Sequence, residues 1–330
     1  DAILRTQPGL IIRSGQTNLV YGGTNQGNFP VFTNGTIPAG ITLDGASVQI
    51  ASGVGRIVRL TANNGSITLS NSPIDVSTSI GTDGIQGSSI ELLATDNIIL
   101  NNSPLTALSS DIIDVTNTTP GGVIVDSDSV QAASNVIGGY VKLTTTNGGI
   151  TLSNSPIDIS VDSSSAINLV KRGSIELTST DAISLDNSPL KSSFSELSGQ
   201  EGQAGTITVS TVNGSILFDN NSSLVSEVSA GLAGRGGDIA VTATNGNITF
   251  RNNSYLASDS SVGSAGRSGD IAVTAINGNI TFDNDSYLSS RSFSGDVGQS
   301  GDISVTAING DITFTDSNLV SLSLLLALSG

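Results

Sequence analysis

Acidic side chains that recur at a fixed interval are the residues of this sequence best placed for chemistry. Asp238, Asp270 and Asp302 each follow a glycine and lie 32 positions apart. Carboxylate oxygens are the ligands that Ca²⁺ prefers, so calcium is the one cofactor that this series would suit. The Gly-Gly-x-Gly-x-Asp signature of calcium-binding β-rolls does not occur. A solvated column of splayed aspartates is the simpler interpretation, and we expect no cofactor.

The sequence lacks the residues of the commonest catalytic sites. It contains no His and no Cys, which excludes Ser-His-Asp triads, thiol chemistry and imidazole or thiolate metal sites. Lyases with a parallel β-helix fold pair acidic calcium ligands with an Arg or Lys base. Here Arg235 and Arg267 recur at the repeat interval, whereas a catalytic residue is normally unique. We therefore expect no enzyme, and keep a carbohydrate-active parallel β-helix (polysaccharide lyase or tailspike-like) as the alternative.

The net charge bears on the possible partners. The chain has 28 acidic and 12 basic residues and a formal net charge of -16. A surface of this sign repels phosphate backbones and anionic membranes, so we expect no nucleic-acid partner and no membrane insertion. The longest apolar run, residues 322–328, is also too short to span a bilayer as a helix.

A repeat of 32 residues organises the C-terminal third of the chain. Three series of apolar residues keep this interval, and we expect all three to stack in the core. They are Ile207, Ile239, Ile271 and Ile303; Phe218, Phe250, Phe282 and Phe314; and Leu224, Leu256, Leu288 and Val320.

Within each repeat the local pattern predicts strands. Ile239 and Val241 alternate with polar residues, which is the period of a strand with one buried face. The pair Asn245-Gly246 predicts a turn, Ile248 to Phe250 a second strand, and Leu256 a third. We expect residues 257–268 to form a Ser/Gly-rich loop without periodicity.

An Ile-x-Leu/Phe-x-Asn unit extends a looser form of the repeat toward the N-terminus. One step of 52 residues predicts a full turn plus a shorter one around Val123–Val125, and a further turn at Ile41. Stacked amides can hydrogen-bond along an axis, so we expect the asparagines to form an internal ladder at one corner rather than a recognition surface. These asparagines are Asn71, Asn102, Asn154, Asn187, Asn220, Asn252 and Asn284.

Three short strands in a repeat cannot bury an apolar face alone, so the copies must stack. We predict an all-β, right-handed parallel β-helix (β-solenoid) of roughly ten coils, with about 32 residues per coil in the C-terminal third. A β-propeller is less favoured, because its blades are longer and the irregular steps would break a closed ring. The expected parts are an N-terminal cap or first irregular coils (1–60), looser coils (61–198), regular repeats (199–320) and an apolar end (321–330).

The repeat also resembles a known family. The pattern Gly-Asp-Ile-Ala-Val-Thr-Ala-x-Asn-Gly-x-Ile-Thr-Phe, followed by Asn-x-Ser-Tyr-Leu, is similar to repeats of filamentous-haemagglutinin-like secreted proteins, above all the repeat-rich exoproteins of cyanobacteria. The likeness covers about residues 199–320 and, diluted, 60–198. It implies a right-handed β-helix, export by a two-partner route, and a role in adhesion or surface structure. The Asn-Pro-Asn-Leu and Asn-Pro-Asn-Gly-Ile motifs of the family's secretion domain do not occur.

Both ends of the chain are apolar with few charges. Ile3, Leu4 and Leu10 lie at one end, and Leu326 and Leu328 at the other. A solenoid exposes unpaired strand edges at its ends. Such ends suggest either truncation from a longer stalk or head-to-tail self-assembly into an extracellular filament, and we expect the segment to polymerise or to continue axially. Surface glycans or other cells are the remaining candidate partners. The expected location is extracellular or at a bacterial cell surface, after secretion.

Overall fold

The computed structural model describes sixteen stretches of the chain, and every regular element in them is a β-strand. The prediction of an all-β fold is confirmed. Within those stretches no helix is long and apolar enough to cross a membrane. They are residues 11–21, 31–33, 41–50, 57–62, 65–75, 89–94, 96–108, 112–120, 122–126, 130–133, 140–163, 173–196, 201–230, 233–262, 265–294 and 297–325.

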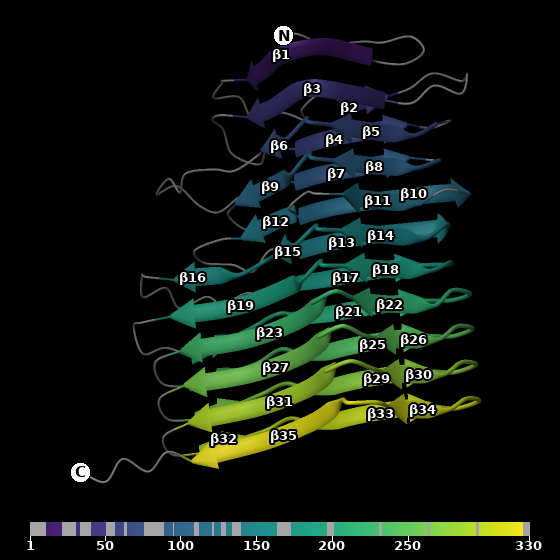
Figure 1. Cartoon of the computed structure of the whole chain (residues 1–330). Helices are drawn as coiled ribbons and strands as arrows, with labels where there is room; N and C mark the ends of the chain where they lie inside the picture. The colour runs from purple at the N-terminus through teal and green to yellow at the C-terminus, as the bar shows by residue number, and fades with distance from the viewer. Residues whose placement is uncertain are drawn as a thin grey trace.

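Successive coils lie one beyond the other from β1 to β35, so that the strands form sheets along a solenoid (Figure 1). One sheet has ten strands, which start the coils. They are β2 (Val31–Thr33), β4 (Ile57–Ala62), β7 (Ser89–Ala94), β10 (Ile112–Pro120), β13 (Tyr140–Asn147), β17 (Ser174–Ser179), β21 (Thr206–Thr211), β25 (Ile239–Ala243), β29 (Ile271–Ala275) and β33 (Ile303–Ala307).

The largest sheet has 21 strands, and most coils contribute a short strand and then a second one to it. Its strands in the N-terminal half of the chain are β1 (Ile11–Tyr21), β3 (Ile41–Ile50), β5 (Ile67–Ser70), β6 (Ile74–Asp75), β8 (Ile98–Asn101), β9 (Leu105–Leu108), β11 (Val123–Asp126), β12 (Val130–Ala133), β14 (Ile150–Ser153), β15 (Ile157–Asp158) and β16 (Val161–Ser163). The later ones are β18 (Ile183–Asp186), β19 (Leu190–Glu196), β22 (Ile216–Asp219), β23 (Ser223–Ala230), β26 (Ile248–Phe250), β27 (Tyr255–Val262), β30 (Ile280–Phe282), β31 (Tyr287–Ser294), β34 (Ile312–Phe314) and β35 (Asn318–Leu325).

A third sheet of four short strands lies in the regular coils. It joins the end of one coil to the start of the next. Its strands are β20 (Glu201–Gln203), β24 (Ala233–Arg235), β28 (Ala265–Arg267) and β32 (Val297–Gln299).

Every strand pairing in the described residues is parallel and joins equivalent positions of neighbouring coils. Ile239 of β25 pairs with Ile207 on one side and with Ile271 on the other, and Ile271 pairs in turn with Ile303. Phe250 likewise pairs with Phe218 and Phe282. Like side chains therefore lie over like ones, and the β-solenoid prediction is confirmed.

The number of coils differs slightly from the roughly ten that the sequence predicted. The strands that start at residues 140, 174, 206, 239, 271 and 303 are about 32 residues apart, which gives about six regular turns. Earlier strands of the same sheet are less evenly spaced. Val123 pairs with both Ile98 and Ile150, so the 52-residue step holds two short coils rather than one full and one short coil. Ile41 pairs with Ile67, which confirms the further turn predicted there.

The core lies inside the coils and is lined by every second residue of each strand. β25 and β29 alternate between buried and half-buried positions, as the period of two requires. The rings of Phe218 and Phe250 stack with centroids 4.5 Å apart, and those of Phe250 and Phe282 with centroids 4.8 Å apart. Stacking identical side chains fills each layer in the same way, so the core needs few residue types.

The expected Ser/Gly-rich loop after Leu256 is mostly strand, and that prediction is wrong. β27 continues to Val262, and β28 follows at Ala265–Arg267. The small side chains of this segment let the last part of β27 and the neighbouring short strand pack closely, with Phe194, Val228 and Val262 as a second, small apolar cluster. Ser and Gly here reflect close packing rather than a loop.

The expected place of Val320 in the leucine series is also wrong. Leu288 pairs with Leu319, and Val320 pairs with Ser289. The corner between Phe314 and β35 is one residue shorter than the corner one coil earlier, so extrapolation by 32 residues lands one position too far.

Candidate functional site

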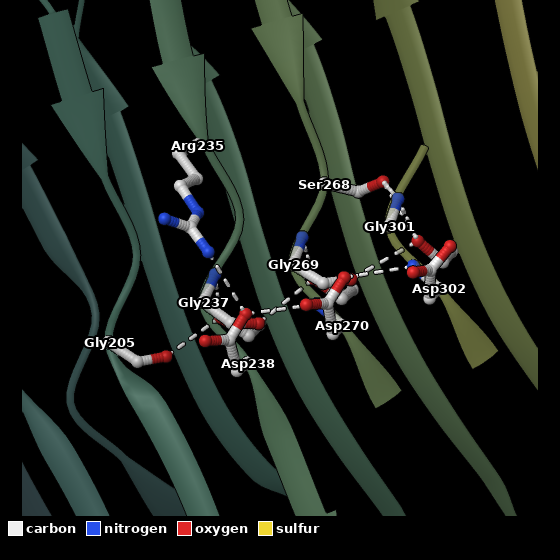
Figure 2. Close-up of polar contacts among 12 residues, drawn as sticks. Gly205, Arg235, Gly237, Asp238, Ser268, Gly269, Asp270, Gly301 and Asp302 are labelled. Carbon is white, nitrogen blue, oxygen red and sulfur yellow. Dashed lines mark hydrogen bonds and ion pairs between the residues drawn. The ribbon is translucent and has the colours of Figure 1, made fainter. Parts of the chain in front are cut away.

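The three repeated aspartates form a column on the outside of the regular coils (Figure 2). Each stands at the start of a strand of the ten-stranded sheet. The backbone N–H of Asp270 donates to Oδ1 of Asp238 at 2.9 Å, and that of Asp302 donates to Oδ1 of Asp270 at 2.9 Å. The carboxylates of Asp238 and Asp270 thus each accept a main-chain bond from the next coil, which offsets part of the repulsion between like charges.

The glycine before each aspartate is fixed by close packing between coils. A Cβ on Gly237 would overlap the carbonyl oxygen of Gly205, and one on Gly269 would overlap that of Gly237. A side chain is therefore excluded at this corner, which explains why the Gly-Asp pair recurs.

A buried serine column holds these glycines and was not foreseen from the sequence. Ser226 Oγ donates to the carbonyl of Gly205 at 2.8 Å and accepts from the N–H of Gly237 at 2.9 Å. Ser258 repeats the arrangement with Gly237 and Gly269. Each of these coils contributes two strands to the 21-stranded sheet, and these bonds join the second of them to the start of two consecutive coils. The signal was present, because the serines keep the 32-residue interval.

The asparagines of the predicted ladder share a backbone conformation. All seven have a positive φ, between 47° and 56°. Asparagine tolerates this left-handed region better than most residues, so the corner itself selects it. In the regular corners a second left-handed residue follows: Asn221, Asn253 and Asp285 have φ of 64°, 62° and 62°.

The ladder lies at the surface, so the expectation of an internal ladder is wrong, and its amide bonds are interrupted. Asn102 donates to Asn71 at 2.6 Å and Asn187 donates to Asn154 at 2.9 Å. A third bond, from Asn284 to Asn252, measures 3.2 Å. Asn220 and Asn252 instead donate to the carboxylates of Asp186 and Asp219, at 2.6 and 2.7 Å. Ser127, at the position between Asn102 and Asn154, lies outside the described residues.

The internal ladder is made by the serine that follows each asparagine in the looser coils. Ser103 Oγ accepts from the N–H of Ser72 at 2.9 Å and donates to the carbonyl of Asn101 at 2.9 Å. Ser188 accepts from the N–H of Ser155 at 3.0 Å in the same way. These hydroxyls are fully buried. A hydroxyl can donate and accept at once, so a single small side chain provides hydrogen bonds to both a backbone carbonyl and a backbone N–H at the corner.

Asp219 is the least exposed acidic side chain among the ion-paired residues. Its carboxylate accepts from Arg251 Nη2 at 2.6 Å and Asn252 Nδ2 at 2.7 Å, and from the N–H of Asn220 at 2.9 Å. Burial opposes ionisation, but the hydrogen bonds from Arg251 and Asn252 outweigh it and hold the pKa of Asp219 below its usual value.

A groove of about 520 Å³ lies over the four-stranded sheet, and we name it the side groove. Two columns of side chains border it, with glycine between them at every coil. One column runs through the paired residues Gln203, Arg235, Arg267 and Gln299. The other includes Ala233, Ala265 and Val297.

Basic side chains are few, and most of those in the regular coils are paired. Arg251 lies 2.6 Å from Asp219 and Arg291 lies 2.8 Å from Asp259, each bridging two coils. Arg235 Nη2 lies 3.4 Å from Asp238 Oδ1, at the edge of the side groove (Figure 2). In the part of the chain that the structure describes, Arg267 makes no ion pair with any acidic residue.

The aspartate column does not converge on a point. No group of three or more acidic side chains that could hold a metal ion occurs within the described ranges. The interpretation of Asp238, Asp270 and Asp302 as a solvated column, with calcium binding as the weaker alternative, stays a prediction from the sequence.

Comparison with known proteins found no match: no family model, no curated protein and no solved structure is significantly similar to the chain. The likeness to filamentous-haemagglutinin-like repeats rests on the sequence pattern alone. The fold and the geometry of its surface carry the functional argument.

Proposed function

We propose that this chain is a secreted structural or adhesive β-solenoid of a bacterial cell surface, which extends by head-to-tail contact through the last coil that the structure describes. The observation that carries the proposal is the exposure of core positions in that coil. Phe314 is 40% and Leu319 48% exposed, whereas Phe282 and Leu288 one coil earlier are fully buried. Ile312 is 41% exposed.

We call the coil of β33, β34 and β35 the open coil. It has two features that favour the stacking of another coil on it. Its apolar side chains keep the stacking register of the core, because the ring of Phe314 lies 4.6 Å from that of Phe282. Its strands β33, β34 and β35 have partners on one side only among the described strands. A further parallel coil would bury the apolar area and pair the strand edge at once. A contact between unlike ends does not close, and so generates filaments.

The sides of the solenoid support a structural or adhesive role in another way. Polar side chains recur there once per coil, as the bonded amides of Asn213, Asn245, Asn277 and Asn309 do. A surface that repeats along its length suits multivalent contact with surface glycans or other cells, because many weak contacts add up. The resemblance of the repeat to secreted adhesins agrees with this role.

Electron microscopy of the purified chain at rising protein concentration tests the proposal. We expect rods that lengthen by end-to-end addition while their width stays constant. A population of single short rods at the highest concentration would contradict it. Incubation with acidic polysaccharides and calcium tests the carbohydrate-active alternative, and release of new chain ends would favour the enzyme.

A further inference from the structure

The shape of the side groove suits an extended ligand that lies along the solenoid. The groove crosses four coils, and its floor is the glycine backbone of the four-stranded sheet. Three of the four positions of one wall are apolar, namely Ala233, Ala265 and the 65% exposed Val297, and the remaining position in register with them is Glu201. The other wall carries planar polar groups of Arg and Gln. An occupant must therefore be narrow, with an apolar side and a side rich in hydrogen-bonding groups.

The floor of the groove is held rigidly from behind. A Cβ on Gly202 would overlap the ring of Phe194, and one on Gly234 would come within 2.9 Å of Val228 and Val262. Phe194, Val228 and Val262 form the second apolar cluster of the fold. A groove on such a support exists before the ligand arrives, so little ordering free energy opposes binding.

The charge in the groove is unbalanced at one position. Arg235 and Arg267 occupy paired positions on adjacent coils, so the same column carries a positive charge in two successive coils. Arg235 has Asp238 at 3.4 Å. Arg267 is exposed, and its guanidinium forms no hydrogen bond or ion pair with a residue that the structure describes. Asp270 stands three residues further on and accepts from the N–H of Asp302. Like charges on neighbouring strands destabilise a sheet unless an anion lies between or beside them.

From this geometry we propose that the side groove binds a linear glycan with carboxylate groups, and that Arg267 pairs with one of its carboxylates. The apolar wall would contact the C–H face of the sugar rings, and Gln203, Arg235 and Gln299 would bond to hydroxyl groups. The columns repeat once per coil, about 4.8 Å, which is similar to the length of one sugar in an extended chain. A guanidinium matches a carboxylate with two parallel hydrogen bonds.

A glycan fits better than a nucleic acid. The phosphate backbone of a nucleic acid offers nothing that the apolar wall of the groove could cover, and its charges would meet the aspartate column of Asp238, Asp270 and Asp302 beside the groove. Each ring of a uronate chain presents a C–H face and hydroxyl groups besides its one carboxylate, so the chain can contact both walls while one carboxylate pairs with Arg267. The inference rests on the proposed function for the class of partner, because surface glycans are among the partners proposed there.

Calorimetric titration of the full chain with tetragalacturonate in EDTA tests the inference. Arg267→Gln removes the charge and installs the residue that the same column carries at Gln299. Arg291→Gln is the matched control, since it removes one positive charge from another face. We expect Arg267→Gln to weaken binding about tenfold and Arg291→Gln to change it less than about twofold. Cellotetraose, which lacks carboxylates, should bind at least about tenfold more weakly than tetragalacturonate.

The inference is overturned if tetragalacturonate does not bind, if both variants weaken it equally, or if cellotetraose binds as well. Inorganic phosphate that binds as tightly and is lost in Arg267→Gln would show a general anion site, which also overturns the glycan assignment. Circular dichroism of both variants confirms that they fold. Filament growth by Arg267→Gln stays as in the unsubstituted chain if only the groove is affected, so the failure of this inference and of the proposed function can be told apart.

Discussion

Ser258 donates a 2.9 Å hydrogen bond to the carbonyl oxygen of Gly237, 21 residues earlier in the chain. The N–H of Gly269 donates to the same hydroxyl at 2.8 Å. One buried side chain therefore joins the start of its own coil, the strand in which it lies and the start of the next coil. Ser226 and Ser290 occupy the equivalent positions one coil away.

Replacing Ser258 by alanine should destabilise the solenoid. The change leaves a buried carbonyl and a buried N–H without partners, which costs about 1–3 kcal/mol. Ser261→Ala, three residues away on the exposed side of the same strand, is the control and should change stability by less than about 0.5 kcal/mol. Urea unfolding followed by circular dichroism measures both. Equal midpoints for the two variants would refute the structural role of the serine column.

Two substitutions of Asn187 distinguish the contribution of the left-handed backbone conformation from that of the side-chain amide hydrogen bond. Asn187→Gly keeps the left-handed conformation at φ 48° but loses the bond to Asn154, whereas Asn187→Ala loses both. The account predicts that the alanine variant is less stable than the glycine variant by about 1 kcal/mol. The same unfolding assay applies. A glycine variant as unstable as the alanine variant would show that the surface ladder, rather than the conformation, holds the corner.

The pairing of Asp219 predicts a dependence of stability on pH. Its pKa in the folded chain lies below the usual value of 3.8, so its contribution is complete above that pH and is lost as the pH falls through the folded pKa. Asp219→Asn should cost about 1–2 kcal/mol at pH 6, and the difference from the unsubstituted chain should shrink toward pH 2. Asp283→Asn, two coils on, removes a carboxylate with no arginine partner in the described structure and is the control. A difference that grows on acidification would contradict the assignment.

Much of the fold could be predicted because the core repeats. The isoleucine and phenylalanine series pair coil by coil, since a fixed interval in the sequence becomes a fixed position in a solenoid. Counting by 32 failed at Leu319, where one corner residue is missing. Spacing alone does not report whether a corner has one left-handed residue or two.

The polar parts of the structure were harder to predict. Ser226 and Ser258 keep the repeat interval, but serine is typical of loops, and only the coiling brings each hydroxyl to a glycine of the neighbouring strand. The side groove is likewise invisible in the sequence, because Arg235 and Arg267 meet only when their coils stack. Periodicity identifies which residues form a column, while the fold decides whether that column faces the core, a corner or the solvent.

The last coil should respond to substitution differently from the coil before it. Phe282 is fully buried between two rings, and Phe282→Ala should cost about 3–5 kcal/mol. Phe314 has one stacked neighbour and is 40% exposed, so Phe314→Ala should cost about half as much or less in the isolated chain. Urea unfolding at low protein concentration measures the contrast. Equal costs would mean that Phe314 is covered in the isolated chain.

Sedimentation velocity of the unsubstituted chain and of Phe314→Asp tests the central proposal, axial assembly through the open coil, most directly. The carboxylate would place a charge on the surface that the next coil must cover, at a cost of several kcal/mol for each contact. We expect the unsubstituted chain to sediment faster as its concentration rises, while Phe314→Asp stays a monomer. Identical, concentration-independent sedimentation of the two proteins would contradict it.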